Sequence, residues 1–174
     1  SYRRDENEKE LNRLSYHDTL TSFYNRNRYI ADTDNLRETQ SPVGIVYLDV
    51  NGLKDINDLR GHAFGDKVLV ECARRMRETF EGADFYRIGG DEFFIICREW
   101  SKEVFEEKVE LLRKNFERDT ICRAAVGSRW AEGSDDLSQI IADADARMYE
   151  DKKEFYRRSP VSRRYRHQSD EVIN

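Results

Sequence analysis

Residues 87–94 read Arg-Ile-Gly-Gly-Asp-Glu-Phe-Phe, and this stretch decides how the rest of the chain is interpreted. Apolar residues flank it on both sides, which predicts a β-hairpin with strands 83–88 and 91–97 around a turn at Gly89-Gly90. A turn without side chains lets a bulky anion approach the backbone. Two carboxylates beside such a turn suit a metal-bound nucleotide phosphate. An ordinary Gly-Gly hairpin with solvated acids explains the same letters.

The bulk composition points to one polar, globular domain. The chain has 174 residues, of which 37% are charged, with a mean hydropathy of −0.89 and a net charge of −5. An acidic balance argues against nucleic acid as a partner, and no apolar stretch reaches membrane-spanning length. The cysteines form no disulfide framework and no metal-ligand pair: Cys72, Cys97 and Cys122. We expect a cytoplasmic segment without membrane contact, which is also consistent with the cytoplasmic part of a membrane-anchored sensor.

Three segments are expected along the chain. Residues 1–16 are highly charged and indicate the end of a helix that enters from an upstream region of a longer protein. Residues 17–156 form the folded domain. Residues 157–174 form a basic C-terminal tail, which is better explained as solvated and flexible than as an anion site.

Helices and strands are mixed within the domain. Apolar spacing predicts the main helices at 26–39, 53–59, 66–80, 101–116 and 137–156. Two more strands are expected at 43–48 and 121–128, with Gly61 and Gly65 bracketing a turn and 130–136 forming a polar loop. This order predicts an α/β fold, an α+β sandwich whose mixed, partly antiparallel central sheet has a ferredoxin-like core flanked by helices.

The end of the first buried strand carries candidate binding residues. Asp49 comes at the carboxyl end of that strand, where ligand-binding groups of α/β sheets gather. Gly52 then leads to a helix N-terminus, whose free N–H groups suit a phosphate, and Lys54 adds a positive charge. The alternative is that Asp49 caps the helix while Lys54 is solvated.

Two further groups of polar residues follow. Asn57 and Asp66 together offer the amide and carboxylate that match a guanine edge, although Asn, Asp and Gly are also ordinary turn residues. His62 alone is better explained as a capping or packing residue. Asp91 begins a strand that would lie beside the strand ending in Asp49, and two such carboxylates make an Mg²⁺ site completed by phosphate oxygens.

Gly-Gly-Asp-Glu-Phe at 89–93 is, letter for letter, the signature of the GGDEF domain, the diguanylate cyclase family. Residues 18–26 resemble the family's opening motif, Asp-x-Leu-Thr-Gly-Leu-x-Asn-Arg. Residues 49–66 resemble Asp-x-Asp-x-Phe-Lys-x-Ile-Asn-Asp-x-x-Gly-His-x-x-Gly-Asp, and residues 144–152 resemble Ala-Asp-x-Ala-Met-Tyr-x-Ala-Lys. These blocks occur in the family's order over about residues 16–156, so the ordinary hairpin is set aside.

The resemblance implies an enzyme that joins two GTP molecules into cyclic di-GMP and releases two pyrophosphates. It implies a fold similar to nucleotidyl cyclase and polymerase palm domains, with 17–156 as the catalytic domain. Each of two subunits would hold one GTP, so a homodimer is needed, controlled by an upstream sensor. The cofactor would be Mg²⁺ or Mn²⁺.

The resemblance also implies roles for individual residues. Asp49, Asp91 and Glu92 would be catalytic, and the same three with the carbonyl of Val50 would hold the metal. The substrate would be bound by phosphate-contacting and guanine-contacting residues: Gly52, Leu53, Lys54, Asn57, His62, Asp66, Gly89, Gly90 and Lys152. An Asp at position 66 suits guanine in both of the nucleotides that are joined, which favours GTP as the only substrate.

The chain departs from the family pattern at several positions. Asn51 replaces a second Asp, Gly52-Leu53 replaces an aromatic-rich pair and Ser22 replaces a Gly. Phe155-Tyr156 stands where many members have Gly-Arg, so a phosphate-binding Arg is missing and Lys153 or Arg157 is a candidate replacement.

A product-binding motif is also missing. Many members carry Arg-x-x-Asp with five residues between it and the first Gly, and this motif binds product and inhibits the enzyme. Here those positions read Phe80-Glu81-Gly82-Ala83. We therefore expect no product inhibition through that site.

Two other functions compete with the cyclase. A catalytically silent module could bind GTP or a protein partner and regulate its neighbour, but such members usually lose the signature acids that this chain keeps. A nucleotidyl cyclase or palm enzyme with another product would share the two-carboxylate logic. The pair Asn57 and Asp66 argues against that third function.

Overall fold

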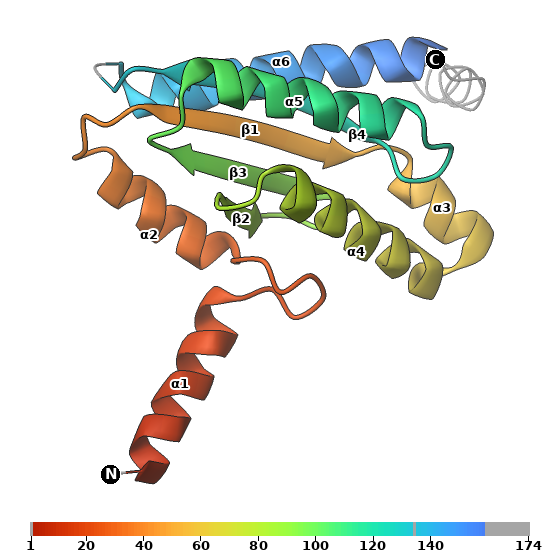
Figure 1. Cartoon of the computed structure of the whole chain (residues 1–174). Helices are drawn as coiled ribbons and strands as arrows, with labels where there is room; N and C mark the ends of the chain where they lie inside the picture. The colour runs from red at the N-terminus through yellow and green to blue at the C-terminus, as the bar shows by residue number, and fades with distance from the viewer. Residues whose placement is uncertain (1, 134, 159–174) are drawn as a thin grey trace, which may run out of the picture.

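The computed structural model describes residues 2–133 and 135–158, as six helices and one sheet within those ranges (Figure 1). The N-terminal half contains α1 Tyr2–Tyr16, α2 Arg26–Leu36, β1 Val43–Val50, α3 Leu53–Arg60 and α4 His62–Thr79. The rest contains β2 Asp84–Arg87, β3 Glu92–Arg98, α5 Lys102–Glu117, β4 Ala124–Ala131 and α6 Leu137–Arg158. The expected basic tail lies outside the described residues, apart from the last residues of α6.

The central sheet has the strand order β2-β3-β1-β4, and all three ladders between these strands are antiparallel. One isolated parallel bridge joins Tyr24 to Tyr86. The α/β class expected from the sequence is confirmed, with a sheet that is more uniformly antiparallel than expected.

Alternation along β1 divides the core into two layers. Val46, Leu48 and Val50 pack with α4 and α5 on one face, whereas Ile45 packs with α2 and α6 on the other. Helices therefore cover both faces of the sheet, as Figure 1 shows. Asp49 has the same parity as Ile45, so its side chain belongs to the α6 face.

The helix expected at 26–39 ends at Leu36. The boundaries expected at Gly65 and at residue 121 are also wrong, in each case because a contact made by a side chain outweighs the local pattern. Gly65 does not end a turn; α4 begins at His62 and Gly65 lies buried inside it. A Cβ on Gly65 would lie 1.8 Å from Asn57 Oδ1, so the glycine permits close packing of α4 on α3. Strand β4 begins at Ala124, not at 121, and extends to Ala131 through part of the expected loop.

The N-terminal helix leaves the body of the molecule in Figure 1. Asn25 joins it to the domain: its Nδ2 donates to the carbonyl of Ser15 at 2.8 Å, while its Oδ1 caps α2 by accepting from the N–H of Arg28. Within the described residues, none of the helices combines the length and the apolar character that crossing a bilayer requires.

Candidate active site

The ends of β1 and β3 bring the predicted acidic residues together. The ladder register pairs Asp49 with Glu92. The N–H of Val50 donates to the carbonyl oxygen of Asp91 at 2.8 Å, so the hairpin is held against the end of β1. The predicted contact between the two acid-bearing strands is confirmed.

Asp49 is a buried carboxylate with one basic partner. Its side chain is 8% exposed, and Lys152 Nζ on α6 donates to its Oδ2 at 2.9 Å. Burial, reinforced by the charge of Asp91, raises the pKa of Asp49 to about 6 against the opposing effect of Lys152. Burial by itself would lower the pKa of Lys152, but the hydrogen bond and charge of Asp49 raise it.

The other oxygen of Asp49 fits a cation. Oδ1 is buried and has no hydrogen-bond partner among the described residues, which is costly unless a ligand satisfies it. No group of three or more His, Cys, Asp or Glu side chains within 2–133 and 135–158 could hold a metal by itself. Two carboxylates with phosphate oxygens and water are the usual partial set for Mg²⁺, so the donor set fits a metal that arrives with a nucleotide.

The Gly89-Gly90 turn leaves open space. A Cβ on Gly90 would meet nothing within 4 Å, whereas one on Gly89 would lie 2.8 Å from Glu92 Oε2. The sequence did not reveal the role of Arg87, whose Nη2 donates to the carbonyl of Gly90 at 2.8 Å and whose Nη1 lies 3.1 Å from Asp18 Oδ1. Hydrogen bonds from Thr21 and the charge of Arg87 lower the pKa of Asp18 despite its partial burial. Asp18 of the opening motif thus fixes Arg87, and Arg87 in turn holds the Gly89-Gly90 turn. The only sequence signal for this role was the position of Arg87 close to the turn.

The start of α3 exposes backbone. Gly52 is the N-cap with φ 69°, a left-handed conformation that favours glycine, and no side chain of the described residues caps the helix. A Cβ there would meet nothing within 4 Å. Leu53 is the first residue of α3 and Lys54 is exposed on its first turn. The unsatisfied N–H groups of this turn can bind an anion.

Helices α3 and α4 carry the predicted guanine-contacting residues. Asn57 Oδ1 is buried against Gly65 without a hydrogen-bond partner in the described chain. Asp66 follows Gly65 on α4 and is exposed, and His62 is exposed as the first residue of that helix.

Near the end of α6 the proposed replacement cations point elsewhere. Lys153 Nζ contacts Glu150 at 3.3 Å and lies over the ring of Tyr149, and Arg157 pairs with Glu154. Both side chains are mostly exposed. Lys152 is therefore the cation of α6 that lies next to Asp49, Asp91 and Glu92, which together are called the acidic centre.

The positions of the missing product-binding motif are occupied by core packing. Phe80 is completely buried, stacks on Trp100 with ring centroids 5.9 Å apart, and meets Phe105 edge to face. This segment ends α4 and leads to β2 through Gly82, whose φ is 89°. An aromatic cluster stands where other members carry a charged motif.

The model of the diguanylate cyclase GGDEF domain matches residues 15–158, and the chain belongs to this family. The chain is similar to the diguanylate cyclase VdcA of Vibrio cholerae, with 32% identity over 148 residues, 78% of this chain and 43% of the relative. It is 27% identical over 147 residues to the diguanylate cyclase DosC of Escherichia coli K12, covering 76% of this chain and 32% of the relative. The chain thus spans less than half the length of these relatives.

Solved structures agree on the fold. The coiled coil and GGDEF domain of DgcB from Caulobacter crescentus, in complex with c-di-GMP, superimposes with a TM-score of 0.76 and 22% identity, covering 87% of this chain and 88% of that one. A microbial GGDEF domain described for its interaction with cyclic di-GMP gives 0.71 and 30% identity, covering 83% and 94%. The first of these likenesses concerns the fold alone.

Proposed function

We propose that this domain is a diguanylate cyclase that condenses two GTP into cyclic di-GMP and two pyrophosphates, with Mg²⁺ or Mn²⁺ and with two copies of the domain. The observation that carries the proposal is the buried Asp49 at the end of β1, next to the half-buried Asp91 and Glu92 at the start of β3. Among the described residues, one oxygen of Asp49 has no hydrogen-bond partner. A fold that needed this acid only for stability would satisfy both of its oxygens.

The proposed metal ligands are Asp49, Asp91, Glu92 and the carbonyl of Val50. A bound divalent cation supplies charge that lowers the pKa of the attacking ribose 3′-hydroxyl and stabilises the leaving pyrophosphate. Asp49 holds its oxygen toward the cation because Lys152 fixes the other oxygen. Gly89 and Gly90 leave room for phosphates next to these acids.

The remaining substrate contacts follow from the exposed backbone and the cations beside it. The N–H groups of Gly52 and Leu53, with Lys54 and Lys152, bind the terminal phosphates. Tyr156 occupies the place of the missing Arg and lies near Lys152, where it adds a small contribution to the raised pKa of Lys152 after the larger effects of burial and Asp49. The domain therefore binds phosphate with one arginine fewer than many relatives.

The guanine base lies between α3 and α4. Asn57 buries its oxygen against Gly65, which leaves the amide nitrogen as donor for guanine O6 or N3. Asp66, the residue after Gly65, is exposed and can accept hydrogen bonds from N1–H and the amino group of guanine. His62, exposed at the start of α4, borders the same base.

Catalysis needs a second copy because one site holds only one of the two reacting nucleotides. Each copy then contributes positioning and electrostatic stabilisation to attack on the facing α-phosphorus. We propose that α1 continues into an upstream sensor that pairs two copies, in a cytoplasmic part of a longer protein. Phe80 and Ala83 supply no charge for a product-inhibition site of the usual kind.

The second candidate is a silent module that binds GTP and regulates the rest of its protein. The loss of a phosphate-binding arginine at the position of Tyr156 favours the silent module. The retained acids Asp49, Asp91 and Glu92 favour catalysis. Incubation of the domain with GTP and Mg²⁺, followed by chromatography and mass analysis, separates the two. We expect cyclic di-GMP from the wild type, none from Asp91→Ala, and a rate that rises faster than linearly with protein concentration.

GTP binding without turnover, even at high protein concentration, would establish the silent module instead. Tight binding of cyclic di-GMP that disappears on mutation within 77–84 would contradict the absence of product inhibition.

A further inference from the structure

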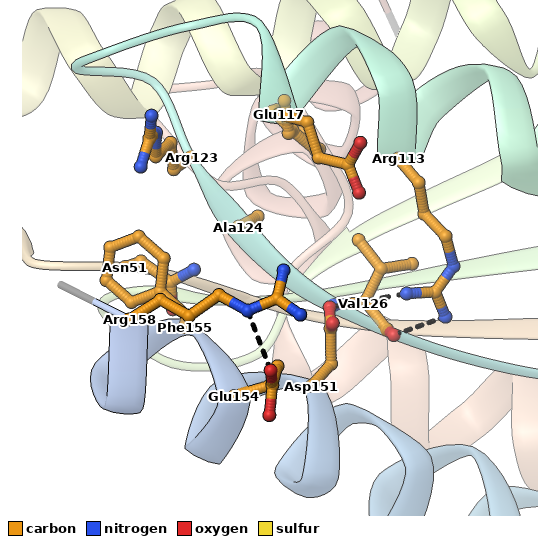
Figure 2. Close-up of a pocket in the computed structure, with 11 residues that line it drawn as sticks. Asn51, Arg113, Glu117, Arg123, Ala124, Val126, Asp151, Glu154, Phe155 and Arg158 are labelled. Atoms are coloured by element: carbon orange, nitrogen blue, oxygen red, sulfur yellow. Dashed lines mark hydrogen bonds and ion pairs between the residues drawn. The ribbon is translucent and has the colours of Figure 1, made fainter.

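A cavity of about 270 Å³ lies between the C-terminal halves of α5 and α6, over the start of β4 (Figure 2). Neither Asp49 nor Lys152 lines it, so it is separate from the acidic centre. Its lining combines charged, amide and aromatic side chains with two small apolar ones: Asn51, Arg113, Phe116, Glu117, Arg123, Ala124, Val126, Asp151, Glu154, Phe155 and Arg158.

One wall of the cavity is fixed by mutually satisfied groups. Asp151 Oδ2 accepts from the N–H of Val126 at 2.8 Å and lies 3.3 Å from Arg113 Nη1. Arg113 Nη2 donates to the carbonyl of Val126 at 2.6 Å. This wall ties α5, β4 and α6 together, so the cavity keeps its shape without a ligand.

Three other polar groups around the cavity have unused hydrogen-bonding capacity. Asn51 is 5% exposed, and its buried Oδ1 has no partner among the described residues. Within the same residues, the side chain of Glu117 is exposed to solvent and makes no hydrogen bond or ion pair, and the half-buried Arg123 side chain donates only through Nε, to the carbonyl of Asp119. Figure 2 shows Glu117 and Arg123 on opposite sides of the start of β4.

The chemistry of these groups defines a ligand class. A carboxylate accepts two hydrogen bonds from N1–H and the exocyclic amine of guanine, and a guanidinium donates to O6 and N7. Phe155 is half-buried and offers apolar surface to a flat ring, and the guanidinium carbon of Arg123 lies 5.8 Å from its ring centre. Since pockets for drug-sized ligands begin at roughly 300 Å³, this cavity accepts one base with its sugar and not a dinucleotide.

We infer that this cavity is a second, non-catalytic site that binds one purine nucleoside through the guanine edge, between Glu117 and Arg123. The site touches the phosphate-binding loop, because Asn51 directly precedes Gly52 and its N–H donates to the carbonyl of Arg123 at 2.8 Å. A guanine nucleoside bound there contacts the loop that precedes α3. The inference concerns binding alone and stands whether or not the domain turns over GTP.

The test is calorimetric titration with guanosine, which lacks phosphate and cannot be a substrate. The protein carries Asn57→Ala and Asp66→Asn, which remove the proposed guanine contacts of the active site. We expect one guanosine per chain, no detectable adenosine, and at least tenfold weaker guanosine binding after Glu117→Gln is added. Glu110→Gln, an exposed acid two turns earlier on α5, serves as the matched control and leaves the affinity unchanged.

A second readout keeps the inference testable if the combined variant does not fold. In the wild-type protein, the amide NMR signals of Ala124 and Phe155 shift on addition of guanosine and stay in place with Glu117→Gln. Absence of these shifts overturns the inference. So does guanosine binding that is insensitive to Glu117→Gln, or adenosine binding of equal strength.

Discussion

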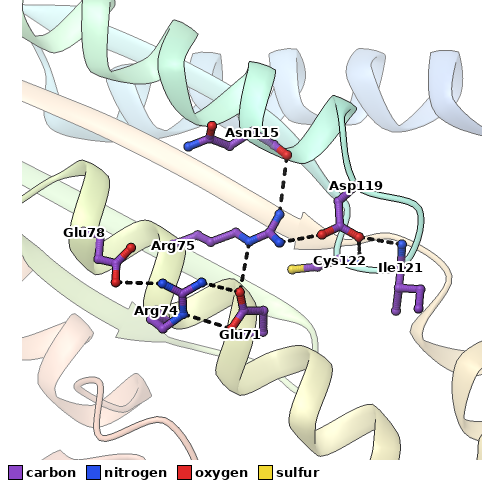
Figure 3. A network of polar contacts seen from close by, with 8 residues as sticks. All are labelled: Glu71, Arg74, Arg75, Glu78, Asn115, Asp119, Ile121 and Cys122. Atoms are coloured by element: carbon purple, nitrogen blue, oxygen red, sulfur yellow. Dashed lines mark hydrogen bonds and ion pairs between the residues drawn. The ribbon is translucent and has the colours of Figure 1, made fainter.

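Two aspartates of this domain each face a basic side chain, yet their surroundings differ in almost every other respect. Asp119 lies in the loop between α5 and β4, where Arg75 Nη2 contacts its Oδ2 at 2.5 Å and its Oδ1 accepts from the N–H groups of Ile121 and Cys122 (Figure 3). Within residues 2–133 and 135–158, Asp49 has one hydrogen-bond partner on one oxygen and none on the other. The first carboxylate is satisfied by the fold, and the second is left with capacity for a ligand.

The pKa values express the same difference. The backbone hydrogen bond from Ile121, aided by Cys122 and Arg75, lowers the pKa of Asp119 to about 2. Burial and Asp91 raise that of Asp49 to about 6. A lowered carboxyl pKa means that the folded state stabilises the negative charge, whereas a raised pKa means that the charge destabilises the folded state. The contrast supports the functional role proposed for Asp49 and a structural role for Asp119.

The largest expected effect comes from Asp49→Asn. Loss of the charge removes a proposed metal ligand, so cyclic di-GMP formation should fall by a factor on the order of 10³ or more, since a metal contributes several kcal/mol. Thermal unfolding without metal should show no loss of stability, because the raised pKa of Asp49 means that its charge destabilises the folded state even with Lys152 beside it. A variant that keeps its activity, or that melts far below the wild type, would contradict the functional assignment of this acid.

Lys152→Met removes the basic partner of Asp49 and tests the same centre with a smaller effect. We expect the steady-state rate of cyclic di-GMP formation to fall on the order of tenfold to a hundredfold, because the phosphates lose one proposed cation and Asp49 loses its fixed orientation. Steady-state kinetics with the matched Lys153→Met variant provides the control. Equal losses in the two variants would show that the position of Lys152 at the acidic centre does not matter.

Asp119→Asn should affect stability and leave the active site alone. Loss of the charge that the turn and Arg75 stabilise is expected to lower the free energy of unfolding by about 2 kcal/mol in urea denaturation. Glu78→Gln, which removes an exposed partner of Arg74 in the same network, should cost less than about 0.5 kcal/mol. Similar losses would mean that burial and backbone contacts do not distinguish the two acids.

The smallest effect is a pH dependence of that difference. Because the pKa of Asp119 is lower in the folded state, its stabilising contribution is complete above its ordinary pKa of 3.8 and disappears as pH falls toward about 2. The stability gap between the wild type and Asp119→Asn should therefore be constant at pH 5 to 7 and narrow from pH 4 to pH 2. Urea midpoints measured across this range check it, and a constant gap down to pH 2 would refute the assigned cause.

Much of the acidic centre could be predicted because it depends on strand pattern. Apolar runs located β1 and β3, and residues at strand ends must lie near one another once those strands pair. Asp49 and Asp91 were placed together on that basis. Lys152 was assigned only through resemblance, since nothing in its own helix pattern marks it as the partner of Asp49.

The rest depended on contacts between distant parts of the chain. Gly65 looked like a turn residue, but its packing against Asn57 lets it continue a helix. The start of β4 depended on Asp119, whose side chain holds the N–H groups at 121 and 122 in a turn. Arg87 and Asp18 are far apart in sequence, and no local pattern predicts their ion pair.

The stack of Phe80 on Trp100 also constrains the evolutionary history open to this domain. An arginine introduced at position 80 would place a guanidinium in a fully buried site among aromatic rings. Burying an unpaired charge there would lower the stability of the folded domain. Introduction of an Arg-x-x-Asp motif at positions 80–83 therefore requires prior changes at Trp100 and Phe105, so the order of mutations matters.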